Sequence, residues 1–158
     1  MTTKPFHYRT CGLSYVYLQN GFQYHETPYG KGVSIFAADK LHEVIARQIV
    51  VSPRPLGGQE VRFLRSLLDI TQADLARLLG STRVSITRWE NKPDDPIPGP
   101  ADAAMRLIYT SSKENDSLIK RVVDTLRERD DAEHSKSTLK KRFTLRTRGN
   151  GWDTARAA

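Results

Sequence analysis

The side chains of residues 83–88 are suited to recognising nucleic-acid bases rather than to breaking bonds. A guanidinium group presents paired N–H donors that fit the two acceptors on a guanine edge. An apolar side chain can pack on a thymine methyl group, and a hydroxyl group can bond a base or a phosphate. The residues of these types are Arg83, Val84, Ser85, Thr87 and Arg88. We expect them to read bases.

A second set of polar side chains flanks this stretch. Amide and cationic groups commonly bond the phosphate oxygens of a nucleic acid, which fixes position without reading sequence. The residues of this set are Gln72, Arg77, Asn91 and Lys92. We expect a loss of any one of them to weaken binding to all sequences alike.

Two short helices joined by a tight turn are predicted to position both sets. Thr71 is a favourable N-cap for the first helix, and Asp74 can complete its capping box. Gly80 ends that helix, because glycine adopts the left-handed conformation without steric cost. Ser81 and Thr82 then offer an N-cap for a second helix over 83–91. Apolar residues line one face of the first helix: Leu75, Ala76, Leu78 and Leu79.

The two predicted helices form a helix-turn-helix. Ile86 and Trp89 would face inward against Leu75 and Leu79, with Ala76 small where the helices cross. The base-reading set then lies on the outer side of the second helix, the part of this motif that enters the major groove.

Residues 71–91, TQADLARLLGSTRVSITRWEN, resemble the helix-turn-helix of the Cro/phage-repressor (XRE) family, whose pattern is TQ…LA..LG.S...I.RWE. The resemblance implies that Gln72 and Asn91 touch phosphates, while Arg83, Val84 and Arg88 read bases. It also implies a homodimer that places two such helices in successive major grooves, about 34 Å apart. Ser81 departs from the family, in which an apolar residue is commoner at this position.

Composition favours a polyanionic partner and a reducing compartment. The 158 residues have a formal net charge of +7 and a pI near 9.7. The single cysteine excludes a disulfide within the chain. No apolar run approaches the roughly twenty residues that a membrane span needs. We expect a cytoplasmic, nucleoid-associated protein without cofactors.

The N-terminal part of the chain is expected to form a small sheet. Aromatic and β-branched residues at 15–18, 22–26 and 32–36 predict a three-stranded antiparallel meander, with Asn20-Gly21 as its first turn. A helix over 38–51 would support it, because so small a sheet does not stand alone. Residues 52–58, rich in proline and glycine, would be a linker.

The remainder of the chain is predicted to be helical and then disordered. Helices are expected at 59–68, 101–109 and 115–129, so the fold class is α+β. The domains would be 1–51, a linker at 52–58, the DNA-binding domain at 59–111, a C-terminal helix within 112–129 and a disordered basic tail at 130–158. The apolar stripe of residues 118–126 is either a dimer seam or core. The basic run 136–148 would either follow phosphates or be solvated.

The first half of the chain is similar to regulators related to MqsA-like antitoxins, in the runs GL.YVYLQNGF..HETPYGKGVSI and PLGGQEVRFLR. Those relatives have a zinc-binding N-terminal part. A zinc ribbon needs four ligands, usually paired as CxxC, and this chain has no such pair, so we expect no metal. The spacings of His7, Cys11, His25 and His42 match no ligand pattern.

These observations predict a sequence-specific, double-stranded DNA-binding regulator, a repressor of its own or a neighbouring operon. The alternative is an antitoxin that represses its operon and binds a toxin through the N-terminal half. The aromatic set at 15–29 would receive such a partner or pack under the helix at 38–51. We expect no enzyme, since no nucleophile–base pair or phosphate loop is present.

Overall fold

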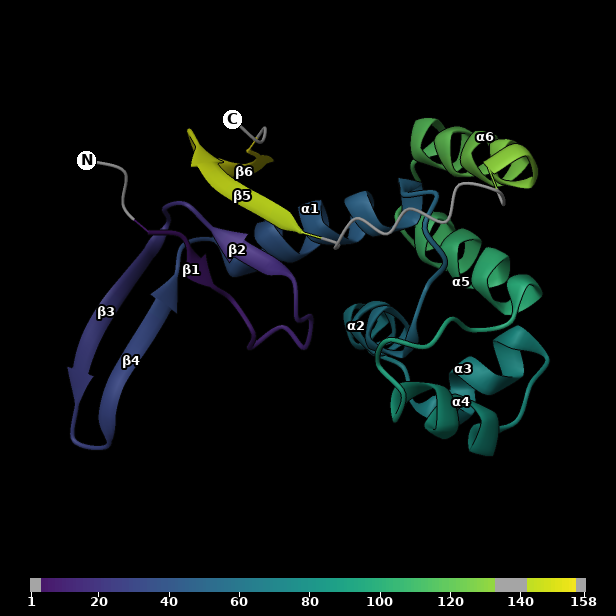
Figure 1. The fold of residues 1–158 in the computed structure, drawn as a ribbon, viewed down its shortest axis with the longest axis horizontal. Helices are drawn as coiled ribbons and strands as arrows, with labels where there is room; N and C mark the ends of the chain where they lie inside the picture. Colours follow the sequence, from purple (N-terminus) through teal and green to yellow (C-terminus); the bar gives the residue numbers. More distant parts are fainter. Residues whose placement is uncertain (1–3, 133–141, 156–158) are drawn as a thin grey trace. The chain divides into compact units, whose positions relative to one another are not determined.

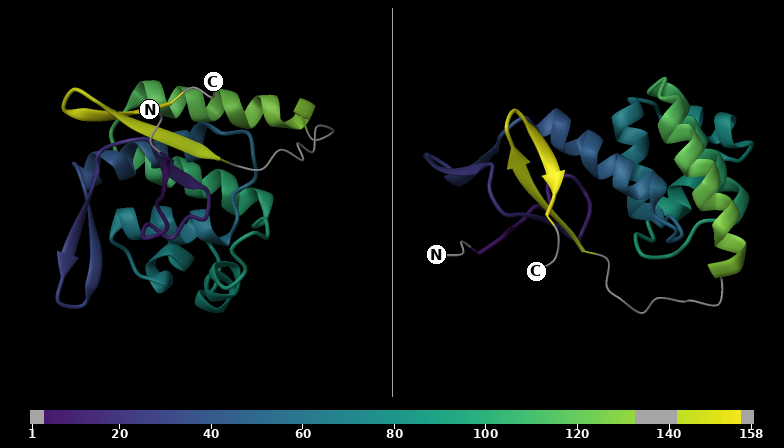
Figure 2. Two further views of the ribbon diagram at one scale, coloured as in Figure 1. Left: turned by 60° about the vertical axis from the view of Figure 1, so that its left-hand side comes forward. Right: turned by 90° about the horizontal axis from the view of Figure 1, so that it is seen from above.

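In a computed structural model that describes residues 4–132 and 142–155, strands from both ends of the chain form one sheet. Its order is β1 (Phe6–His7), β2 (Val16–Leu18), β5 (Phe143–Arg148) and β6 (Gly151–Thr154). β2 and β5 are parallel, and the other neighbours are antiparallel (Figures 1 and 2). The sheet belongs to the first of two compact units, whose described residues are 4–45 and 142–155.

The first unit has a core between its sheet and the start of α1 (Ala38–Val51). Trp152 joins this core, and its indole N–H donates to the Phe36 carbonyl oxygen over 2.8 Å. The fully buried apolar residues of this unit include Leu13, Val16, Leu18, Leu41, Ile45 and Leu145. Burial of these side chains supplies the main driving force for this part of the fold.

The segment expected to be a disordered tail is therefore partly folded, and that prediction is wrong for residues 142–155. Leu145 is fully buried in β5, and Trp152 is buried in β6. Arg142 lies over the Tyr17 ring, 4.0 Å from its centroid. Although the composition of the tail is polar, a few apolar residues on the buried face of a strand are enough to pack that strand into the core. The part of the basic run before Arg142 lies outside the described residues.

The predicted N-terminal strands are present, but they do not pair as one three-stranded meander. β3 (Phe22–Thr27) and β4 (Gly30–Ile35) form a separate antiparallel hairpin. Asn20 does not close a turn between β2 and β3. Its side-chain oxygen instead accepts hydrogen bonds from the Thr147 N–H at 2.6 Å and the Thr147 hydroxyl at 3.0 Å.

Gly21 turns the chain from one sheet into the other. Its φ of +77° is favourable only for glycine. A Cβ atom there would lie 2.5 Å from side-chain atoms of both Thr147 and Trp152. The Asn20-Gly21 pair thus changes the direction of the chain, as expected of a turn. Its contacts, however, are with Thr147 of β5 and Trp152 of β6.

The second unit, with described residues 46–132, is helical. It contains the end of α1 followed by α2 (Gly58–Leu68), α3 (Gln72–Leu79), α4 (Arg83–Glu90), α5 (Gly99–Ser112) and α6 (Asp116–Ala132) (Figure 1). The fold class of α+β is confirmed, including the helical region that follows the N-terminal strands.

Within α6, Leu118 and Val122 are buried inside the chain. The Thr125 hydroxyl donates to the Val51 carbonyl oxygen at the end of α1 over 3.2 Å. These positions of the 118–126 stripe are therefore core, whereas Ile119, Val123 and Leu126 stay partly exposed. Within the described residues, no helix combines the length and apolar character that crossing a membrane requires.

Candidate nucleic-acid interface

The local signals between Thr71 and Ser85 act as expected. The Thr71 hydroxyl accepts the Asp74 N–H over 3.1 Å, and the Asp74 carboxylate accepts the Thr71 N–H over 3.3 Å. Gly80 ends α3 with φ +64°, in the left-handed region. The Thr82 hydroxyl then accepts the Ser85 N–H over 3.1 Å and caps α4. These bonds satisfy N–H groups that a helix start otherwise leaves unpaired.

Packing of α3 against α4 determines which face of α4 is free. Leu75, Ala76 and Ile86 are buried between the helices, as predicted. Val84 lies on the opposite side and is 68% exposed. Arg83 and Arg88 are also exposed. Since Val84 and Arg88 are four residues apart, they lie on one helix face, with Arg83 beside them.

Ser85 and Thr87 differ from these three residues because they are half-buried and make hydrogen bonds within the motif. The Ser85 hydroxyl accepts from the Thr82 hydroxyl over 3.0 Å. The Thr87 hydroxyl lies 3.0 Å from both the Gln72 side-chain oxygen and the Arg83 carbonyl oxygen. The predicted base-reading set thus divides into three exposed residues and two that also stabilise the motif.

Gln72, at the start of α3, links the two helices through its amide group. Its Nε2 donates to Glu90 Oε2 over 2.8 Å, and its Oε1 accepts from Thr87. An amide nitrogen has two N–H donors, so one remains for a ligand. The predicted phosphate-binding residue therefore also positions α4 relative to α3.

Glu90 connects this contact to α2. Its carboxylate accepts from Arg65 Nε over 2.6 Å and from Arg65 Nη2 over 3.2 Å, in a paired geometry. The Glu90 side chain is only 6% exposed. Arg65 also donates to the Ile70 carbonyl oxygen before α3. The sequence did not indicate this pair, because its partners lie on helices separated by the whole of α3.

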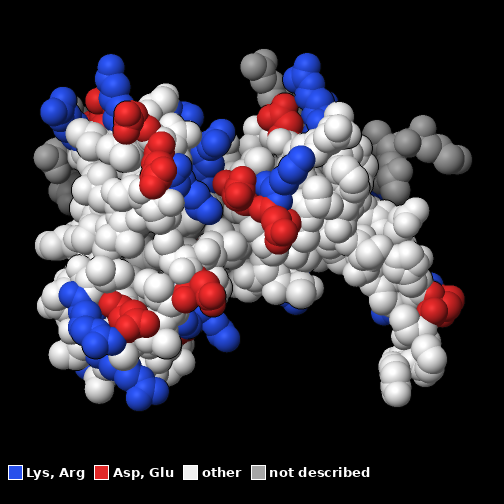
Figure 3. Space-filling model, turned by 180° about the vertical axis from the view of Figure 1, so that it is seen from behind, with Lys and Arg blue, Asp and Glu red and all other residues white. Residues whose placement is uncertain are grey.

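The other predicted phosphate-binding residues are at the surface. Arg77 forms an exposed ion pair with Asp74 at 2.6 Å. Hydrogen bonds from Thr71, together with those from Arg77, hold the pKa of the Asp74 carboxyl below its usual value. Asn91 and Lys92, at the end of α4, are exposed. Figure 3 shows basic side chains gathered around the end of the helical unit that contains α3 and α4, with acidic side chains beside them.

Because Gly58 has no side chain, the loop after α4 can approach the start of α2 closely. A Cβ atom on Gly58 would lie 1.8 Å from the Trp89 carbonyl oxygen and 2.7 Å from that of Lys92. Nearby, the Gln59 N–H donates to the Pro93 carbonyl oxygen over 3.2 Å. The expected linker thus ends in a tight contact that positions the C-terminal end of α4.

His7, His25 and His42 each have a hydrogen-bond partner of their own. His7 bonds the Ser14 carbonyl oxygen at 2.7 Å, and His25 bonds the Ser34 hydroxyl at 2.6 Å. His42 lies 2.9 Å from the Tyr8 hydroxyl. Burial raises the pKa of the Cys11 thiol, which disfavours the reactive thiolate. Among the residues that the structure describes, no three potential ligands form a metal site.

Residues 61–100 match the family model described as helix-turn-helix. No curated protein matches the chain, and no solved structure does. The matched range contains the capped α3, the Gly80 turn, the exposed face of α4 and most of α2. Residues 61–100 are therefore a helix-turn-helix of the Cro/phage-repressor type, the kind of domain found in DNA-binding transcription regulators.

Proposed function

We propose that the protein is a sequence-specific, double-stranded DNA-binding repressor. The observation that supports this proposal is the exposed face of α4 within a helix-turn-helix. Arg83, Val84 and Arg88 are solvent-accessible there, while Ile86 fixes the opposite face in the core. Such a helix presents donors and an apolar group to the floor of the major groove.

Arg83 and Arg88 are the proposed readers of guanine. Each would contribute about 1–3 kcal/mol of discrimination if its guanidinium bonds both acceptors of one base. Val84 would contact a thymine methyl group. Ser85 and Thr87, which are half-buried, would refine the readout at the edge of the contact.

Gln72, Arg77, Asn91 and Lys92 are the proposed phosphate contacts. Gln72 begins α3, where unpaired backbone N–H groups and the helix dipole favour an anion. Arg77 would exchange Asp74 for a phosphate, because its ion pair is exposed to solvent. Asn91 and Lys92 would contact the backbone beyond the other end of α4.

The protein would act on an inverted repeat as a homodimer. Two copies of α4 then enter successive major grooves on one side of the duplex, about 34 Å apart. Binding at such a site beside its own gene would block transcription, which is the repressor activity we propose.

The proposal is tested by incubating the purified protein with genomic fragments at about 150 mM salt, where non-specific contacts are reduced. We expect enrichment of one palindromic site near its own gene. Affinities for that site and for a scrambled sequence are then compared between the wild type and Arg88→Ala. The ratio of the two affinities should fall by about 5–100-fold in the variant.

Arg121→Ala, an exposed arginine of α6, is the matched control and should leave the ratio unchanged. Lys92→Ala should weaken binding to both sequences equally. Sequence-blind enrichment by the wild type, or an unchanged ratio for Arg88→Ala, would contradict the proposed function.

A further inference from the structure

The β3–β4 hairpin has one free strand edge whose hydrogen-bonding groups can be assigned from its register. The Phe36 N–H donates to the Gly21 carbonyl oxygen over 2.8 Å, so these two residues are a hydrogen-bonded pair. Such pairs alternate along an antiparallel ladder. The backbone N–H and C=O groups of Lys31, Val33 and Ile35 therefore point outward from β4. No further strand pairs with β4 within the described part of the chain.

The same alternation makes the hairpin amphipathic. Phe22, Tyr24, Val33 and Ile35 share one face, together with Glu26 and Lys31 near the tip, whereas the other face has Gln23, His25, Thr27 and Ser34. Phe6 contacts the apolar face, with its ring centroid 5.2 Å from that of Phe22 and 6.2 Å from that of Tyr24. Tyr24 nevertheless remains 61% exposed. A two-stranded ribbon whose apolar face is only partly covered is marginally stable in water.

We infer that β4 pairs with β4 of a second copy of this chain, which makes one four-stranded antiparallel sheet. In the register centred on Val33, each Val33 lies opposite the Val33 of the other copy, and Lys31 lies opposite Ile35. All the outward-pointing groups of β4 then pair, giving about six hydrogen bonds between the two chains. Registers shifted to either side along the strand pair fewer of them.

The charges of the hairpin agree with this register. The two Lys31 residues are separated by about 13 Å along the strands, so like charges do not meet. The aliphatic stem of each Lys31 can cover Ile35 of the second copy. The middle row of the sheet reads Tyr24, Val33, Val33, Tyr24, a favourable combination of aromatic and β-branched residues.

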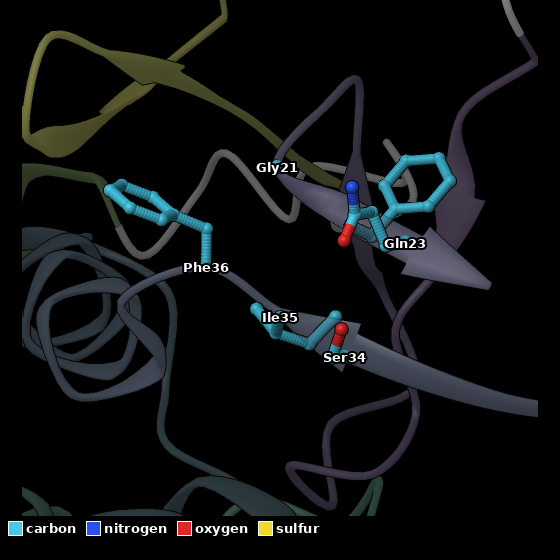
Figure 4. A pocket seen from close by; sticks show the side chains of 6 residues that line it. Gly21, Gln23, Ser34, Ile35 and Phe36 are labelled. Atoms are coloured by element: carbon cyan, nitrogen blue, oxygen red, sulfur yellow. The ribbon is translucent and has the colours of Figure 1, made fainter. Parts of the chain in front are cut away.

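The tip and the base of the hairpin are also complementary. Tyr29, at the tip, is 100% exposed. A hollow of about 500 Å³ lies at the base, lined by Gly21, Phe22, Gln23, Ser34, Ile35 and Phe36 (Figure 4). In the proposed register Phe36 lies opposite Gly30 of the second copy, which brings Tyr29 of that copy to this hollow.

The inference rests on the proposed function only for the expectation of two copies at one operator, and it is tested without DNA. The full chain should sediment as a dimer in analytical ultracentrifugation. Val33→Pro removes an N–H that points away from β3, so the hairpin ladder itself is spared. This change should raise the dimer dissociation constant about tenfold or more. Tyr29→Ser, which alters only the tip, should also raise it.

Glu26→Pro is the matched control, because its N–H points outward from the opposite edge of the hairpin. It should leave the dissociation constant unchanged. A monomeric wild type, or a dimer unaffected by both Val33→Pro and Tyr29→Ser, overturns the inference. So does a wild type that stays monomeric and buries β4 only against a different protein.

A cross-linking experiment tests the register. In a Cys11→Ser background, Val33→Cys places two thiols across the two-fold axis, where Cα atoms are about 5.5 Å apart and a disulfide can form. Ser34→Cys is the control, since its copies lie about 8 Å apart and exceed the reach of a disulfide. Rapid oxidation of the first variant alone supports the inference, and equal or absent oxidation of both contradicts it.

Discussion

Arg106 Nε donates to Asp102 Oδ1 over 2.6 Å in the helical unit, and both side chains are fully buried. Arg106 also donates to the backbone carbonyl oxygens of Val50, Ser52 and Arg54, at and beyond the end of α1. Asp102 Oδ2 accepts the Leu56 N–H over 2.7 Å. The last carbonyl groups of a helix lack partners within the helix. One buried ion pair on α5 therefore satisfies the end of α1 and holds the segment that leads to α2.

Arg106→Met should lower the free energy of unfolding by about 3–5 kcal/mol, because Asp102 is left as a buried charge and several carbonyl groups lose their donor. Urea denaturation followed by circular dichroism measures the change. Arg121→Met, at an exposed position of α6, serves as the control and should change stability by less than about 0.5 kcal/mol. A loss below about 1 kcal/mol in Arg106→Met would show that the pair does not stabilise this unit.

Gly58→Ala should destabilise the helix-turn-helix. The new methyl group would lie 1.8 Å from the Trp89 carbonyl oxygen, which is backbone and cannot rotate away. Overpacking of this kind commonly costs about 1–3 kcal/mol. Thermal unfolding measures it. Gly99→Ala is the matched control, since a Cβ atom there meets nothing within 4 Å, and it should be neutral or slightly stabilising. Equal melting temperatures for the two variants would contradict the close approach.

The helix-turn-helix could be predicted because its signals are local. Thr71 and Asp74 cap one helix, Gly80 ends it, and each acts within four residues of its partner. The role of Arg106 could not be predicted in this way, although Asp102 stands four residues before it on one helix face. Nothing in that spacing indicates that the pair is buried against the end of α1.

The pairing of β2 with β5 could not be predicted from local signals either. Val16 lies opposite Phe143, and Leu18 lies opposite Leu145, in a parallel ladder. Parallel strands need a long connection, so no turn residue between them signals the pairing. The Asn20-Gly21 dipeptide did indicate a change of direction, but the identity of its partner, Thr147, depends on tertiary contacts.

His42 should make the stability of the first unit depend on pH. Burial lowers the pKa of His42 below its usual value of about 6.5, although nearby Asp39 opposes this shift. Its Nε2 lies 2.9 Å from the Tyr8 hydroxyl and can accept that proton only when the ring is neutral. As the pH falls below about 6.5, the unfolded state therefore binds more protons at His42 than the folded state does. The stabilising contribution is present above about pH 6.5 and is lost as the pH falls through the lowered pKa of the folded state.

The test compares the wild type with His42→Gln, which retains an acceptor for Tyr8 and does not titrate. The difference in unfolding free energy between the two should shrink or reverse as the pH is lowered from about 7.5 to about 5. His25→Gln, at an exposed position of β3, is the matched histidine-to-glutamine control. A parallel profile for His42→Gln would assign the pH dependence to other groups.

Leu145→Ala should destabilise the sheet that joins the two ends of the chain. Leu145 is fully buried, and its carbonyl oxygen accepts the Gln19 N–H over 2.8 Å, so β5 is packed as well as hydrogen-bonded. Truncation of a buried leucine to alanine costs about 2–5 kcal/mol.

Hydrogen exchange of the β2 and β5 amides measures the effect within this unit. Those amides should exchange about 30-fold faster or more in the variant, if exchange follows the opening equilibrium. Arg146→Ala, at the exposed neighbouring position, should leave the rates near those of the wild type. Unprotected β5 amides in the wild type itself would mean that residues 142–155 are a free tail, as their polar composition predicts.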